Sequence, residues 1–203
     1  MLGQCGTNKA MCAARLPRDS ARNSPRKPPR PLDQARLDAL ALAYVGRFAT
    51  TRAKLQLYLA RKLRERGWED QSEPATAALA ERLARLGYID DAAYALAKGR
   101  SLGQRGFGRR RVSMALRAAG VGEEDGRAAN EAAKAEALSA ALRFAERRRL
   151  GPYAAGAVDP KLRQRGLAAM VRAGHDFDLS RRIIDLPPGT LVEQWIEDFG
   201  ADM

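Results

Sequence analysis

Three consecutive arginines, Arg109, Arg110 and Arg111, stand where a short helix should begin. In the stretch RGFGRRRVSMALRAAGV, glycines precede them and Gly120 follows an apolar face at helical spacing, which predicts a helix ending near that glycine. The first turn of a helix carries the positive end of the macrodipole, so each cation there is unfavourable by roughly 0.3–1 kcal/mol. Arginine offers phosphate or carboxylate a planar, permanently charged donor fork. We therefore expect an anion at this turn, held by the arginines and by the backbone N–H groups of their helix.

The basic cluster extends beyond these three residues. Residues 98–117 contain seven basic residues and no acidic one. Any single arginine is best interpreted as part of a solvated face, but a cluster without a compensating acid favours binding of an anionic partner. The candidate residues for binding a partner or DNA are Arg100, Arg105, Arg109, Arg110, Arg111 and Arg117. Residues 143–172 hold eight basic residues against two acidic ones, and there the two interpretations are evenly balanced.

Residues that could do catalytic or metal chemistry are scarce. The only histidine, His175, follows a glycine predicted to end a helix, which favours a capping or solvent-exposed role over general base chemistry. Asp90 and Asp91 precede a predicted helix, which favours capping over metal binding. Cys5 and Cys12 lie in a polar stretch far from the histidine, and no phosphate-binding loop ends in Gly-Lys-Ser/Thr. We expect no enzyme activity, no catalytic residue, no metal site and no cofactor.

The elements that position these residues are predicted to be helices throughout. Apolar residues recur at i, i+3, i+4 and i+7 from Leu37 onward, and no alternating strand pattern interrupts them. Gly67, Gly120 and Gly174 each end a predicted helix, at intervals of 53 and 54 residues. This period indicates an all-α fold of tandem three-helix repeats in an elongated, curved arrangement. The predicted parts are a disordered basic arm at 1–31, repeats at 32–89, 90–133 and 134–186, and an acidic C-terminal helix at 187–203.

The charge of the chain is unevenly distributed. The net charge is +12, half of it in residues 1–31, while residues 173–203 carry two basic and seven acidic residues. This asymmetry favours a polyanionic or acidic-surfaced partner, and nucleic acid is the usual candidate. No apolar run is long enough to span a bilayer or to form the core of a signal peptide, so we expect a cytoplasmic protein that does not bind membranes.

Three stretches, in the order ALAYVGRFATTRAKL, RLARLGYIDDAAYA and RGFGRRRVSMALRAAGV, resemble the RecX family of bacterial regulators of the RecA recombinase. The resemblance covers roughly residues 35–185 and is strongest in the first two predicted repeats. Members often have Gly-Pro at the start of the fifth helix and an acidic residue within it, where this sequence has Gly108-Arg109 and Met114. These departures make the local charge more positive and favour a larger share of direct DNA contact.

The resemblance implies tandem three-helix repeats and a non-enzymatic role in DNA recombination, repair and the SOS response. It implies binding along the groove of a RecA filament on single-stranded DNA, and inhibition of the recombination, ATPase and co-protease activities of RecA. The partners are then the RecA filament and single-stranded DNA, contacted directly or through RecA, and we expect a monomer. The residues alone leave an alternative, an independent basic helical nucleic-acid-binding protein. A third possibility is that the acidic helix at residues 190–199 docks on the repeats of its own chain and masks the basic face.

Overall fold

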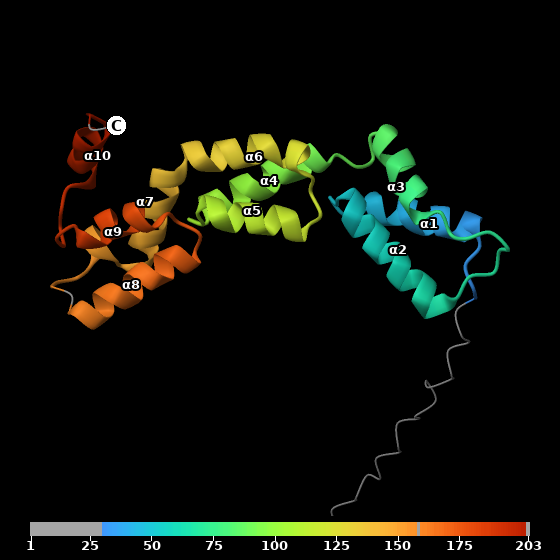
Figure 1. The fold of residues 1–203 in the computed structure, drawn as a ribbon, viewed down its shortest axis with the longest axis horizontal. Coiled ribbons are helices and arrows are strands. Elements are labelled where there is room, and N and C mark those ends of the chain that lie inside the picture. The colour runs from blue at the N-terminus through green and yellow to red at the C-terminus, as the bar shows by residue number, and fades with distance from the viewer. Residues whose placement is uncertain (1–29, 158, 202–203) are drawn as a thin grey trace, which may run out of the picture. The chain divides into compact units, whose positions relative to one another are not determined.

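The computed structural model describes residues 30–157 and 159–201, with side chains as far as residue 197 (Figure 1). Nearly all of the arm predicted at 1–31, including Cys5 and Cys12, lies outside the described residues. Within the described ranges every regular element is a helix, which confirms the all-α class. The elements are α1 Gln34–Val45, α2 Arg52–Arg66, α3 Thr76–Arg85, α4 Asp91–Gln104, α5 Arg109–Ala118, α6 Glu123–Ala135, α7 Ala137–Arg148, the short 3-10 helix η1 Gly151–Tyr153, α8 Pro160–Arg172, α9 Phe177–Asp185 and α10 Val192–Ala201.

The buried apolar side chains form three clusters along the chain. The first core lies among α1, α2 and α3, the second among α4, α5 and α6, and the third among α7, α8 and α9. Phe107 packs against both the second and the third core. Representative fully buried residues are Leu55 and Leu59 in the first core, Val112 in the second, and Met170 and Ile183 in the third. The three clusters are what a chain of three-helix units requires, since each group of helices buries its own apolar faces.

The acidic helix α10 adds to the third core. Val192 is buried there and Trp195 packs against the same cluster. The sequence left open that this helix docks on its own chain and masks the basic face. The structure shows apolar contacts with the third core, and masking of the basic face stays a prediction. None of the helices in the described part of the chain is long and apolar enough to cross a membrane.

The three periodic glycines have the left-handed backbone expected at helix ends. Their φ angles are 82° at Gly67, 69° at Gly120 and 94° at Gly174. A Cβ at Gly120 would lie 2.2 Å from Cβ of Ala53 in α2, and one at Gly174 would lie 2.4 Å from the backbone nitrogen of Arg111 in α5. These two positions therefore require glycine both for the turn and for a close approach between helices.

The second helices of the three groups meet end to end. The Thr51 hydroxyl at the start of α2 donates to the carbonyl of Ala119 at the end of α5, at 2.6 Å. At the start of α5, the N–H of Gly108 donates to the carbonyl of Ala173 at the end of α8, at 3.0 Å. In both joints the negative end of one helix meets the positive end of another, an arrangement that the helix dipoles favour.

Candidate partner-binding surface

The six candidate arginines occupy α4, the turn after it, and α5. Arg100 lies in α4, Arg105 ends α4, and the other four lie in the first and last turns of α5. All six side chains are exposed. The sequence therefore predicted a basic surface at residues that do face solvent.

Three of these arginines surround one shallow hollow. Arg109, Arg110 and Arg117 line an open depression of about 460 Å³, together with Met114 of α5 and Asn130 of α6. Met114 is 54% exposed, so an apolar side chain stands among three cations. The depression therefore combines positive charge with one apolar contact surface.

Arg110 is the one member of the six with an acidic partner among the described residues. Its guanidinium lies 3.7 Å from the carboxylate of Asp176, and both side chains are about 60% exposed. Exposed pairs of this kind contribute about 0–1 kcal/mol, so a stronger ligand can displace this contact.

Two other arginines cover the ring of Phe107. The guanidinium carbons of Arg105 and Arg111 lie 5.3 and 6.0 Å from the ring centroid. Arg100 borders a small hollow that Phe107 also lines. Because Phe107 contacts two cores, these arginines are tied to packing at the joint as well as to the basic surface.

The prediction that an anion binds the backbone N–H groups at the start of α5 is wrong. The N–H of Gly108 donates to Ala173 and that of Arg110 donates to Gly174, both carbonyls at the end of α8. The N–H groups of Arg111 and Val112 bond the carbonyl of Gly108. The negative end of α8 thus lies where an anion was expected, and the N–H groups of Gly108 and Arg110 are already bonded to it.

His175 is also not where the sequence placed it. We expected a capping or exposed side chain, but the residue is only 2% exposed. Its Nε2 lies 3.0 Å from the carbonyl oxygen of Gly106, and its ring centroid lies 5.5 Å from that of Phe144. Burial lowers the pKa of His175 below its ordinary value, although the hydrogen bond with Gly106 opposes this shift. The ring therefore joins the end of α8 to the turn before α5.

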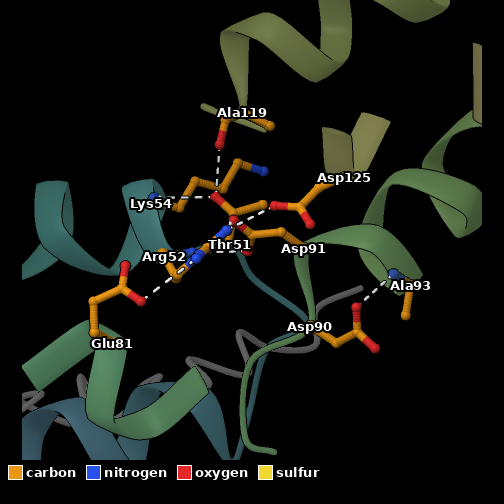
Figure 2. A network of polar contacts seen from close by, with 9 residues as sticks. All are labelled: Thr51, Arg52, Lys54, Glu81, Asp90, Asp91, Ala93, Ala119 and Asp125. Atoms are coloured by element: carbon orange, nitrogen blue, oxygen red, sulfur yellow. Dashed lines mark hydrogen bonds and ion pairs between the residues drawn. The ribbon is translucent and has the colours of Figure 1, made fainter. Parts of the chain in front are cut away.

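The adjacent carboxylates at 90 and 91 have different roles. Asp90 caps α4 as predicted, accepting a hydrogen bond of 2.7 Å from the N–H of Ala93. Asp91 instead reaches across to α2, where it accepts bonds of 3.0 Å from both the N–H and the Nε of Arg52 (Figure 2). The side chain of Asp91 is 3% exposed. It therefore caps a helix that belongs to another core.

Arg52 is the centre of a polar network that the sequence analysis missed. Besides Asp91, its guanidinium contacts Asp125 of α6 at 2.7 Å and Glu81 of α3 at 3.4 Å (Figure 2). The hydrogen bond with Asp91 raises the pKa of Arg52, and burial opposes that shift. The available signal was an arginine at the first position of a helix with no acid in its first turn. The same signal drew attention to α5.

Two known proteins that are similar to this chain in sequence have the same name. The chain is 31% identical over 185 residues to the regulatory protein RecX of Myxococcus xanthus, covering 84% of this chain and 99% of that protein. It is 30% identical over 138 residues to the regulatory protein RecX of Agrobacterium fabrum, covering 66% and 73%. No protein-family model matches the chain.

Solved structures show a similar fold. A crystal structure of RecX from Lactobacillus salivarius gives a TM-score of 0.53 at 18% identity, over 74% of this chain and 93% of that one. A second crystal structure of a regulatory protein RecX gives 0.54 at 22% identity, over 75% and 71%.

Proposed function

The chain belongs to the RecX family, and from that premise we propose that it is a non-enzymatic regulator that binds the RecA filament on single-stranded DNA and inhibits it. The activities inhibited are recombination, ATP hydrolysis and co-protease function. The curated relatives carry the name regulatory protein RecX, which supports a regulatory role directed at RecA.

The proposal is supported by the lack of acidic partners around most of the candidate arginines in the described part of the chain. Among the described residues, no acidic side chain pairs with five of the six candidate arginines, although they lie within 18 residues of one another. These are Arg100, Arg105, Arg109, Arg111 and Arg117. Exposed cations that no acidic side chain of their own chain neutralises are available to phosphates or to acidic side chains of another molecule.

Within this set, Arg109 and Arg117 are the residues that we assign to partner contact. They line the depression beside Met114 and form no ion pair or ring contact with another described residue. Two turns of α5 separate them, so they engage successive anionic groups along one direction. Arg105 and Arg111 act more indirectly, since they also cover Phe107.

The test is DNA-dependent ATP hydrolysis by the RecA of the same organism, with this protein titrated in. We compare the wild type with the double variant Arg109→Glu/Arg117→Glu. The matched control is Arg64→Glu/Arg85→Glu, which makes the same charge change at exposed positions of α2 and α3. We expect the α5 variant to lose inhibition by at least tenfold and the control to retain it. Equal inhibition by all three proteins would remove the arginine surface from the mechanism.

Binding to RecA-free single-stranded DNA is measured in parallel at two salt concentrations. Inhibition well below the concentration that saturates bare DNA supports recognition of the filament. Inhibition that appears only as bare DNA becomes covered, with a steep salt dependence, supports the alternative of an independent nucleic-acid-binding protein.

A further inference from the structure

The third group of helices carries a second hollow, which the proposed function does not use. It has a volume of about 560 Å³ and is lined by the end of α7, one face of α8, the end of α9 and the residues that follow it. Pockets of this size hold a large side chain or a small ligand.

The inner surface of this hollow is aliphatic. It is lined by Leu150, Ala169, Ile184 and Leu186, with Leu162 half-exposed at the edge. Gly166 of α8 keeps it open, because a Cβ there would lie 3.2 Å from methyl groups of Leu150 and Ile184. A hollow of this kind accepts an apolar side chain and offers few hydrogen bonds.

The rim of the hollow is basic. Arg148, Arg149, Arg163 and Arg165 line it, and Asp185 is its only acidic residue. Asp185 pairs with Arg163. Arg149, which ends α7 at this rim, has a φ of 54°. It is the only non-glycine residue with a positive φ in the described part of the chain. The rim thus keeps a net positive charge around an apolar interior.

We propose that this hollow binds an acidic peptide segment of a partner protein. One apolar side chain of the segment enters the aliphatic interior, and neighbouring carboxylates bond the rim arginines, whose planar forks match carboxylate geometry. A nucleic acid fits less well, because bases bind chiefly by stacking on aromatic rings and this lining has none. None of the six candidate arginines lines this hollow, and its binding of peptide is measured without RecA.

The probe is a fluorescein-labelled nonapeptide of aspartate and glutamate with one central phenylalanine, titrated with the full-length protein and followed by anisotropy. A second peptide has serine in place of the phenylalanine, and an oligo(dT) strand of similar charge serves as the nucleic-acid probe. The protein variants are Arg165→Glu at the rim and Gly166→Leu, which fills the interior. The control is Arg172→Glu, an exposed arginine of the same helix that does not line the hollow.

We expect the phenylalanine peptide to bind at least tenfold more tightly than the serine peptide. Arg165→Glu and Gly166→Leu should each lower the affinity for the phenylalanine peptide at least tenfold. Arg172→Glu should lower it less than threefold. Because Arg165 is exposed, that variant keeps the test decisive even if Gly166→Leu fails to fold. Equal affinity for both peptides, or an equal loss with Arg172→Glu, would reduce the binding to general charge attraction and overturn the proposal. Preferential binding of oligo(dT) that depends on Arg165 would overturn it in favour of a nucleic-acid site.

Discussion

Nε of Arg52 lies 3.0 Å from one carboxylate oxygen of Asp91, and the backbone N–H of Arg52 donates to the other oxygen at the same distance (Figure 2). One side chain thus supplies both the counter-ion of the arginine and the cap of its helix. At α5 the corresponding partner is the carbonyl end of α8. An arginine in the first turn of a helix therefore does indicate a negative group nearby, and in both cases the chain itself provides one.

Replacement of Asp91 by asparagine should destabilise the protein more than the same change at Asp90. Asp91 is buried, so losing its charge weakens hydrogen bonds to a charged group, at a cost of about 1–2 kcal/mol given that Arg52 is partly exposed. Asn caps a helix as well as Asp does, so Asp90→Asn should cost less than about 0.5 kcal/mol. Urea denaturation measures both values. Equal losses would show that the link between Arg52 and Asp91 contributes nothing beyond capping.

Because Gly120 lies close to Ala53, we expect that a second substitution at Ala53 restores part of the stability lost when Gly120 is replaced. Gly120→Ala and Gly87→Ala both place a side chain on a left-handed backbone, at about 1–2 kcal/mol each. Only Gly120→Ala also collides with Ala53, which adds about 1–3 kcal/mol, whereas nothing lies within 4 Å of a Cβ at Gly87.

Adding Ala53→Gly should recover part of the stability lost in Gly120→Ala, because it removes the atom in collision. In a Gly87→Ala background the same second change should only destabilise, by about 1 kcal/mol for a glycine in a helix. Denaturation midpoints of the single and double variants give the coupling directly. Additive effects at Gly120 would mean that the joint moves apart freely.

The helical class and the ends of several helices could be predicted because their signals are local. Helical spacing of apolar residues and the glycines at 67, 120 and 174 are local signals, and the structure confirms the all-α class and the helix ends. The contacts between the end of one helix and the start of another could not be predicted from local signals. Thr51 and Ala119 are 68 residues apart, and no local pattern pairs them. The boundaries of the predicted repeats remain predictions, which the three separate cores support.

The candidate surface was predicted only in part, for a physical reason. Clustered charge reports on exposure, so the six arginines lie at the surface as expected. Residue types do not reveal which backbone N–H groups are already bonded. The N–H groups of Gly108 and Arg110, at the start of α5, donate to carbonyls at the end of α8. His175 is a single polar residue without a periodic partner, so its burial against Phe144 could not be deduced from its position after a glycine.

The buried His175 predicts a loss of stability in mild acid. Because its pKa is lowered in the folded chain, the unfolded chain takes up a proton more readily as the pH falls below about 6.5. The free energy of unfolding should therefore be level near pH 7–8 and fall from about pH 6.5 downward, until the folded ring is itself protonated. His175→Gln keeps a donor for Gly106 and does not titrate, so the fall between about pH 7 and pH 5 should be much smaller. Denaturation at several pH values measures the difference, and parallel curves for the two proteins would contradict this role.

Reversing Arg109 should separate stability from regulation. Arg109 stands in the first turn of α5, where the carbonyl end of α8 already offsets the helix dipole, so Arg109→Glu should change stability by less than about 0.5 kcal/mol. Arg117 lies in the last turn, where a cation is favourable, so Arg117→Glu should lower stability by a similar amount. If both side chains contact the partner, the two variants lose inhibition of RecA alike, although only Arg117→Glu loses stability. Thermal denaturation and the ATPase assay on the same preparations check this. Loss of inhibition in Arg117→Glu alone would mean that the effect follows stability, and that Arg109 has no part in recognition.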